Sequence, residues 1–393
     1  MRTPVDQPIY LDYQATTPLD GRVLDAMLPY LAGTFGNPSS IHEFGFAAAE
    51  AVDRARAKIA AGLGAERREI IFTSGATEAN NLALKGLAAA AAPRRHHLVA
   101  SATEHPAVLE PLETLARAGF DITLLEVDQD GLPDLDRLAA VVDERTLVVS
   151  VAAANSEIGT IPPLRAIADI CHAQGALLHT DAAQAVGKIP LDVDREGVDL
   201  LSVSAHKLYG PKGVGALFVR HEHRPKLRPL LDGGGQEQGL RSGTLNVPAI
   251  VGFGAAIELA GEKLPQEARR LAHLRDRLRD ALTQELDGVV VNGAAQRLPG
   301  NLNVRFVGVD AEALIANCPG VAFSAGSACS AGTPQPSHVL LALGLAEEAA
   351  SESVRFSVGR QTTADEVDAA AEQVVQAVTR VRSARRSAAG ALR

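Results

Sequence analysis

A lysine at the end of an apolar segment is the first residue whose surroundings indicate chemistry. The tetrapeptide Ser204-Ala205-His206-Lys207 follows such a segment and precedes a loop rich in glycine and proline. Most lysines are solvated surface residues, which is the alternative interpretation of Lys207. A lysine that emerges from a buried strand is desolvated, and its amine is then nucleophilic enough to form a Schiff base near neutral pH. Lys212, deeper in the glycine loop, is a rival for this role.

A carboxylate and an amide follow a second apolar segment. Asp181 lies just beyond Ala176–His179, and Gln184 comes three residues later. One interpretation makes Asp181 a helix N-cap. The other pairs its carboxylate with a pyridinium nitrogen, which keeps that nitrogen protonated so that the ring acts as an electron sink. Gln184 would then reach the phenolic oxygen of the same ring.

The segment Phe72–Glu78 has the pattern of a strand, a short turn and the start of a helix. Free backbone N–H groups at a helix start bind anions such as phosphate. Thr77 also suits a helix N-cap, and both interpretations are compatible. The chain lacks the GxxxxGK[ST] motif, so a nucleoside triphosphate is the weaker candidate for the anion.

The three cysteines are Cys171, Cys318 and Cys329, and they form no CxxC pair. This spacing fits a reducing compartment, and it fits neither a disulfide framework nor a metal site. Cys171 lies on a helical pattern and Cys318 ends another, so both are expected to be buried. The stretch Ser324–Pro334 around Cys329 has no bulky apolar side chain. We expect a loop there that carries a thiol into an active site.

The elements that position these residues alternate between strand and helix from about Glu69 to Val219. Continuous apolar strands separated by helices predict an α/β fold with a mostly parallel sheet covered on both faces. Such sheets bind ligands at the carboxyl ends of their strands, where these polar residues lie. The expected strands are 69–72, 98–101, 122–127, 146–151, 176–179, 200–203 and 215–219, with helical patterns at 78–87 and 164–173.

The pattern changes after Gly254. A charged helical segment at 255–286 leads into expected strands near 302–306, 321–324 and 353–357, and an amphipathic helix runs from 364 to about 381. These elements predict a smaller α+β domain that carries the Cys329 loop. The expected division is a large domain over residues 16–254 and a small domain made of residues 1–15 and 255–393.

Composition excludes several classes of function. The chain has 393 residues, more than the ~250–300 at which a single core stops growing. Its net charge is −9 and its aromatic content is 4%, so direct nucleic-acid binding is not expected. Neither a signal peptide nor an apolar stretch of about 18 residues is present, which predicts a cytoplasmic protein without a membrane span.

Taken together and in chain order, eight segments resemble the NifS/IscS-type cysteine desulfurases of the class V aminotransferase family. The resemblance runs from Tyr10 to about Gly359 and implies a fold type I enzyme that depends on pyridoxal 5′-phosphate (PLP). It also implies a homodimer with shared active sites. The segments are Tyr10–Pro18, Phe35–Ser39, Thr73–Glu78, Thr103–His105, Asp181–Gln184, Ser204–Lys207, Arg241–Thr244 and Gly326–Cys329.

The resemblance implies a role for each matching residue. Lys207 would bind PLP covalently, Asp181 would pair with its pyridine nitrogen and Gln184 with its phenolic oxygen. His105 would stack on the ring and transfer protons. Phosphate contacts are implied for Ala76, Thr77, Ser204 and His206, with Thr244 reaching in from the partner subunit.

Arg355 resembles the clamp for the substrate carboxylate, together with Asn37, since a guanidinium fork suits a carboxylate better than an amine does. This chain departs from the family pattern at one expected pair of cofactor contacts, Asn155 and Ser156, where the relatives carry two asparagines. Aligned on Glu157, Ser156 occupies the position of an asparagine that touches the cofactor or substrate. Whether Ser156 makes that contact stays open.

The predicted reaction converts L-cysteine to L-alanine and leaves the sulfur on Cys329 as a persulfide for an acceptor protein. That acceptor is an iron–sulfur scaffold, a thiolation pathway or DNA modification, and the sequence does not choose among them. One alternative is another fold type I PLP aminotransferase or lyase, which has no use for a loop thiol. The other is a sulfur-trafficking component whose main role is protein binding.

Overall fold

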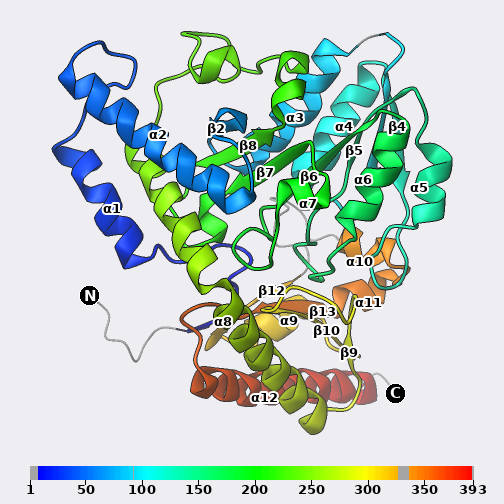
Figure 1. Ribbon diagram of the computed structural model, residues 1–393. Coiled ribbons are helices and arrows are strands. Elements are labelled where there is room, and N and C mark those ends of the chain that lie inside the picture. Colours follow the sequence, from blue (N-terminus) through cyan, green and yellow to red (C-terminus); the bar gives the residue numbers. More distant parts are fainter. Residues whose placement is uncertain (1–7, 92, 326–335, 392–393) are drawn as a thin grey trace.

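The computed structural model describes residues 8–91, 93–325 and 336–391. The chain folds into a large part built on a wide sheet and a smaller part beside it, with helix α8 running from one to the other (Figure 1). In the described residues, no helix is long and apolar enough to cross a membrane.

In the described residues, the large part contains a seven-stranded sheet whose strand order is β2-β8-β7-β6-β5-β3-β4. Strand β8 runs antiparallel to both of its neighbours, and the other pairings are parallel. The predicted fold class is therefore confirmed, with one reversed strand that the apolar pattern did not reveal. The strands are β2 (Ile70–Thr73), β3 (His97–Ser101), β4 (Asp121–Leu125), β5 (Thr146–Ser150), β6 (Leu177–Asp181), β7 (Leu200–Ser204) and β8 (Gly215–Val219).

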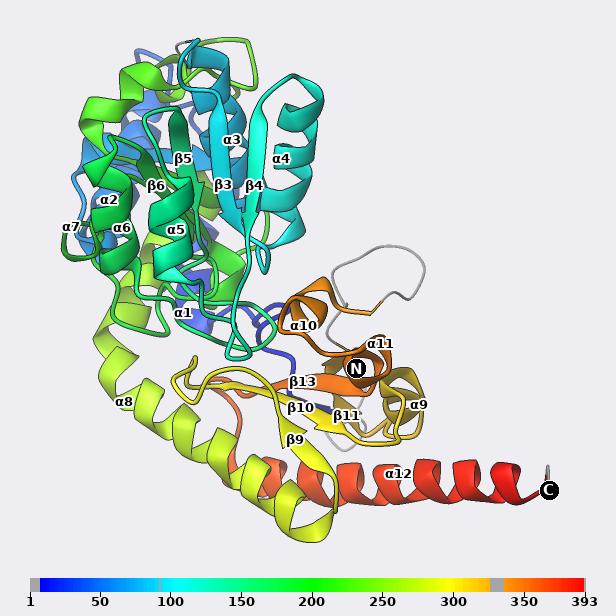
Figure 2. The same ribbon diagram turned by 90° about the vertical axis from the view of Figure 1, so that its right-hand side faces the viewer.

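Helices cover both faces of this sheet (Figure 2). Successive strand residues point to opposite faces, so Leu200 packs in one core cluster and Leu201 in the other. This double burial explains why the strands are continuously apolar. One face carries α3 (Ala76–Ala90) and α4 (Pro106–Arg117). The other carries α2 (Glu43–Leu63), α5 (Leu135–Val141), α6 (Leu164–Ala173), α7 (Val193–Glu196) and the first half of α8, and α1 (Gly21–Ala32) packs against α8.

The smaller part has its own core around an antiparallel sheet in the order β12-β13-β10-β9. A second, two-stranded parallel sheet joins the start of the described chain to this smaller part. The strands are β1 (Ile9–Tyr10), β9 (Val289–Val291), β10 (Asn301–Phe306), β11 (Val321–Ala322), β12 (Ser324–Ala325) and β13 (Ser353–Ser357). The helices are α9 (Ala311–Ala316), α10 (His338–Ala342), α11 (Glu347–Ser351) and α12 (Ala364–Ala391).

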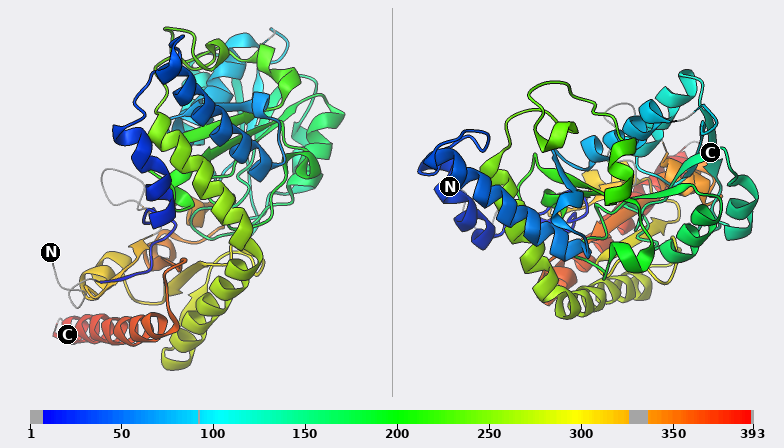
Figure 3. Two further views of the ribbon diagram at one scale, coloured as in Figure 1. Left: turned by 60° about the vertical axis from the view of Figure 1, so that its left-hand side comes forward. Right: turned by 45° about the horizontal axis from the view of Figure 1, so that its top comes forward.

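Helix α8 (Val247–Glu285) is 39 residues long and belongs to both cores. It begins eight residues before the expected segment, because the side chain of Asn246 caps it by accepting from the Ala249 N–H. Figure 3 shows the helix running from the large part into the smaller one. The division of the chain near Gly254, within this helix, remains a proposal.

Three details differ from the expected elements. The segment near 321–324 splits into two short strands that join different sheets. Helix α12 extends to Ala391 instead of about Val381, and Cys318 lies two residues beyond the end of α9 instead of at it. Short 3₁₀ helices occupy Arg67–Glu69, Ala205–Lys207, His221–Lys226 and Glu237–Gly239.

Candidate active site

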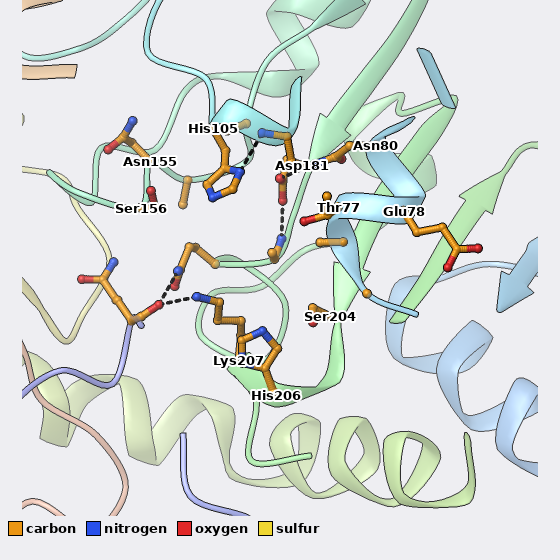
Figure 4. Close-up of a pocket in the computed structure, with 18 of the residues that line it drawn as sticks. Thr77, Glu78, Asn80, His105, Asn155, Ser156, Asp181, Ser204, His206 and Lys207 are labelled. Atoms are coloured by element: carbon orange, nitrogen blue, oxygen red, sulfur yellow. Dashed lines mark hydrogen bonds between the residues drawn. The ribbon is translucent and has the colours of Figure 1, made fainter. Parts of the chain in front are cut away.

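A pocket of about 380 Å³ lies at the edge of the large sheet where the parallel strands end. Strands β2, β6 and β7 deliver their last residues or the following turns to it, as expected for a parallel sheet. Gln14 and Arg355, from the N-terminal segment and β13, complete its wall. Figure 4 shows His105 and Asp181 on one side and Lys207 on the other.

Lys207 ends the 3₁₀ helix that follows β7. Its Nζ donates to the main-chain oxygens of Gln14 at 2.5 Å and Ala15 at 2.9 Å. The Thr17 hydroxyl donates to the oxygen of His206 and ties the same N-terminal segment to this helix. The lysine is half-buried and faces the pocket, as predicted, and its rival Lys212 is exposed but also lines the pocket.

Asp181 ends β6 with a buried carboxylate. Oδ1 accepts from the Ala183 N–H at 2.9 Å and Oδ2 from the Asn80 side-chain amide at 2.7 Å. No helix starts after Asp181, so the N-cap interpretation is wrong. Because both donors are neutral, the charge of the carboxylate remains available to a cation in the pocket. Sequence reasoning missed Asn80, which lies on α3, 101 residues away.

His105 caps α4 with its ring. Nδ1 accepts from the Ala107 N–H at 3.0 Å, so the neutral ring carries its proton on Nε2. Burial lowers the pKa of His105, and Lys207 lowers it further against the opposing effect of Asp181. A cationic ring would need a proton on the atom that already accepts. The ring is therefore suited to stacking and to donating from Nε2, and proton transfer by His105 stays a prediction.

The preceding residue, Glu104, is fully buried beside this site. Its Oε1 accepts from the Ala152 N–H at 2.5 Å, and its main-chain oxygen accepts from His338 Nε2 at 2.9 Å. Burial, and then the charge of Asp181, raise the pKa of Glu104 well above its usual value. Both effects favour the neutral form of Glu104, which would add no second negative charge beside Asp181.

The start of α3 forms the far end of the pocket, next to Thr77 and Ser204 (Figure 4). Gly75 precedes the helix, and none of the described side chains caps it. Gly215 of β8 lies opposite Thr73 and Ser204, and a Cβ there would come within 2.7 Å of the Gly75 Cα. Only glycine allows this approach, which places uncapped backbone N–H groups beside the Ser204 hydroxyl.

His206 borders the same end. Its Nδ1 lies 3.1 Å from the Thr16 hydroxyl. Burial, followed by the nearby amines of Lys207 and Lys212, lowers the pKa of His206 to about 4. A neutral ring whose Nδ1 accepts from Thr16 carries its proton on Nε2, which leaves a donor for an anion.

Arg355 forms the opposite end with Asn155 and Ser156. Its Nη1 donates to the main-chain oxygen of Ser156 at 2.9 Å, and its Nη2 donates to Asp12 Oδ1 at 2.8 Å. Any residue at position 156 supplies that carbonyl, so the serine found there preserves this contact. The Asn155 amide accepts from two backbone N–H groups and donates to Thr103 O, which shapes the loop.

Eleven of the predicted site residues line this pocket, and two others that the structure describes, Asn37 and Thr244, do not. Asn37 is exposed and accepts from the Ser39 N–H. Thr244 is exposed, although Arg241 of the same motif donates to Glu78 at the pocket rim at 2.9 Å. Cys329 lies outside the described residues. The residues in the pocket are Ala76, Thr77, His105, Asn155, Ser156, Asp181, Gln184, Ser204, His206, Lys207 and Arg355.

The other two cysteines are buried, as predicted. Burial raises the pKa of Cys171 to about 12 and also raises that of Cys318. Since the thiolate is the nucleophilic form, both are chemically inert at neutral pH.

Comparison with known proteins agrees with the geometry. The aminotransferase class-V family model matches residues 9–370. The cysteine desulfurase IscS of Anaeromyxobacter sp. (strain Fw109-5) is 52% identical over 377 residues, which is 95% of this chain and 93% of that protein. A solved NifS-like protein superimposes with a TM-score of 0.89 at 37% identity, covering 95% of this chain and 100% of that one.

The solved structure of SspA in complex with cysteine has a TM-score of 0.80 at 37% identity and covers 89% of this chain and 98% of that one. Relatives that match nearly the whole chain at this identity share its architecture as well as its motifs. The chain belongs to the class V aminotransferase family and, within it, to the cysteine desulfurases.

Proposed function

We propose that this protein is a PLP-dependent cysteine desulfurase that receives the substrate sulfur on Cys329. One observation carries the proposal: motifs dispersed over the chain meet in one pocket that combines Lys207, Asp181 and Arg355. An amine, a carboxylate and a guanidinium at separate positions of the wall suit a cofactor bound beside an amino-acid substrate. The name of the solved SspA complex supports cysteine as that substrate.

The described residues fit PLP, the cofactor of this family. The carboxylate of Asp181, oriented by Asn80 and Ala183, suits a pyridine nitrogen. The uncapped start of α3 suits the phosphate, with Ala76, Thr77, Ser204 and His206 around it. When bound, PLP supplies an electron sink for negative charge at the substrate α-carbon.

Each protein group then has a task of its own. Lys207 would hold the cofactor covalently in the resting protein, and its Nζ, once the substrate amine has displaced it, would move the α-proton of the substrate. Arg355, oriented by Asp12 and the Ser156 carbonyl, binds the substrate carboxylate. His105 covers the ring and donates from Nε2. The Cys329 thiolate attacks the sulfur of cysteine and the carbon–sulfur bond breaks. The electron pair of that bond stays with the β-carbon, which takes up a proton, so that alanine leaves and the persulfide stays on Cys329.

Both described ends of the segment that contains Cys329 are attached to pocket walls. Ser324 pairs with Arg355 between β12 and β13. On the other side of the segment, the Ser337 hydroxyl donates to Glu157 at 2.5 Å, and His338 Nε2 donates to the oxygen of Glu104. These attachments support a thiol that acts in this pocket and not elsewhere.

We also propose a homodimer. Most of the large exposed apolar side chains of the described chain lie within residues 19–46. Leu24, Leu28 and Leu31 form one exposed stripe of α1, and Phe35 is 72% exposed just beyond it. Apolar surface concentrated in this way is typical of an interface. A second subunit covering it would also allow the partner subunit's Thr244 to reach the phosphate.

The sulfur acceptor is proposed as a class only: a protein of iron–sulfur assembly or of thiolation. The described cysteines form no disulfide, and we keep the cytoplasm as the proposed location. Asn37 stays a proposed substrate contact.

Incubation of the purified protein with PLP and L-cysteine, followed by amino-acid analysis, tests the function. One alanine per sulfur transferred is expected. A keto acid in place of alanine would identify an aminotransferase, and pyruvate with free sulfide would identify a lyase. Binding of acceptor proteins without any alanine would favour a trafficking role.

A further inference from the structure

A second lysine contacts the cofactor pocket from behind. The Nζ of Lys188 donates to the Oε1 of Gln184 at 2.5 Å. Lys188 lines a separate small cavity of about 40 Å³ next to Gln14 and Tyr209, while Gln184 lines the cofactor pocket. Gln14 lines both spaces, and the amide of Gln184 connects Lys188 to the wall of the cofactor pocket.

The partners of this amide determine which way it points. Its Nε2 donates to the main-chain oxygen of Gln14 at 2.9 Å, the oxygen that also accepts from Lys207. The main-chain oxygen of Gln14 only accepts, so a flipped amide would oppose acceptor to acceptor there, and its oxygen would no longer accept from Lys188. The observed orientation keeps Oε1 behind the pocket and leaves the second N–H of Nε2 for a group inside it.

Removal of Lys188 would remove chiefly a hydrogen bond. Burial, followed by the charges of Lys207 and Arg355, lowers the pKa of Lys188 well below its usual value. A neutral amine still donates an N–H, so the contact with Gln184 does not require the charge.

We propose that Lys188 is a positioning residue, which acts through Gln184 to direct an amide N–H at the phenolic oxygen of the cofactor. This inference rests on the proposed function. A donor to that oxygen stabilises its ionised form and so lowers the pKa of the chromophore that the cofactor forms with Lys207. Without Lys188 the amide rotates and the donor is lost for part of the time.

The test is a spectral pH titration of the cofactor-loaded protein in a double-mutant cycle. Gln184→Met should raise the chromophore pKa by about one unit, the size expected for one hydrogen bond to a charged group, and Lys188→Met should raise it by a measurable but smaller amount. The double variant should shift no further than Gln184→Met alone, because Lys188 acts through that residue. Lys188→Arg, which retains a donor, should restore the pKa toward that of the wild type.

Additive shifts, or an unchanged pKa in Lys188→Met with full cofactor occupancy, would overturn the inference. Where Lys188→Met does not fold, Lys188→Ala replaces it with the same expected shift, and thermal melting reports folding independently. Failure of the wild-type protein to form alanine would overturn the proposed function instead, and the titration would still report on Lys188. Normal alanine formation together with additive pKa shifts would support the proposed function and show that Lys188 does not act through Gln184.

Discussion

The carboxylate of Asp12 holds the guanidinium of Arg355 at 2.8 Å, across 343 residues of sequence. Arg355 is 3% exposed and Asp12 is 17% exposed. The pair lies where the N-terminal segment passes β13, and the Ser156 carbonyl holds the other guanidinium nitrogen. A buried arginine fixed at two nitrogens enters substrate binding already oriented, which lowers the entropy that binding must overcome.

Loss of this pairing should weaken cysteine binding. Arg355→Lys removes the planar fork, and Asp12→Asn leaves the guanidinium less constrained. Steady-state kinetics should show KM for cysteine raised about 10-fold or more by Arg355→Lys and less by Asp12→Asn, with smaller changes in kcat. Arg220→Lys, at an ion pair with Asp194 beyond the end of β8 that lies away from the pocket, is the control. A change confined to kcat in both variants would place Arg355 outside carboxylate binding.

Lys207→Ala should lose the covalently bound cofactor. The wild-type protein should be yellow, and borohydride reduction followed by peptide mass mapping should mark Lys207. Lys212→Ala should keep both signals, because that exposed amine lies in the loop beyond the 3₁₀ helix. A spectrum unchanged in Lys207→Ala and lost in Lys212→Ala would reverse the assignment.

Cys329→Ser should separate cofactor chemistry from sulfur transfer. The variant should bind PLP and cysteine normally, yet alanine formation should fall roughly 100-fold or more, because a hydroxyl is scarcely ionised at neutral pH. Cys171→Ser should affect only stability, by about 1–3 kcal/mol for a buried hydroxyl, and so should Cys318→Ser. Near-normal alanine formation by Cys329→Ser without added thiol would favour a lyase that ejects sulfide directly.

Charge on the exposed apolar stripe should break the dimer. Leu28→Glu combined with Phe35→Glu places carboxylates on side chains that are 50% and 72% exposed. Sedimentation should show a dimer for the wild type and a monomer for this variant, with weaker PLP retention because Thr244 no longer reaches the partner. Leu124→Glu, on an edge strand at 52% exposure, is the control that should remain dimeric. A wild-type monomer with full PLP occupancy and activity would rule the dimer out.

Acid should diminish the contribution of His179 to stability. This buried ring lies between Ser150 Oγ at 2.8 Å and Ser202 Oγ at 3.1 Å, and burial lowers its pKa to about 4. In the unfolded chain the pKa of this ring is about 6.5. Between pH 6.5 and pH 4 the His179 ring is therefore protonated in the unfolded chain but neutral in the folded protein. Stability therefore falls with falling pH, by up to ~1.4 kcal/mol per unit for one such group.

Burial raises the pKa of Glu157 to about 7, so the folded protein binds the extra proton at this group and its contribution to stability rises as pH falls. The measurement is therefore the difference in unfolding free energy between the wild type and His179→Gln in urea. That difference should shrink as pH falls from 6.5 to 4. A constant difference would mean that His179 is protonated in the folded protein.

Local patterns were sufficient to predict the strands of the large sheet and a few pocket residues, and the resemblance to the desulfurases implied the others. Continuous apolar runs place β3, β5, β6 and β7 within one or two residues of their observed bounds. Polar residues directly after such runs must gather at one edge, because parallel strands end together. This reasoning identifies Asp181 at the end of β6 and Lys207 in the turn after β7.

Contacts between distant segments could not be predicted from those local patterns. Asn80 orients Asp181, Lys188 orients Gln184, and Asp12 orients Arg355. Nothing in the local sequence distinguishes these side chains from other polar residues, since their partners depend on the path of the chain. The reversal of β8 is of the same kind, because an apolar strand buried on both faces has the same composition in either direction.

The amino-acid sequence by itself thus determined which chemical groups the protein possesses and the strand ends at which most of them stand, because hydrophobic periodicity and turn residues act over short distances. The tertiary structure alone decided how those groups are oriented: which nitrogen of His105 carries the proton, which face of Gln184 meets the pocket, and what holds Arg355. Orientation depends on hydrogen bonds between segments that only folding brings together.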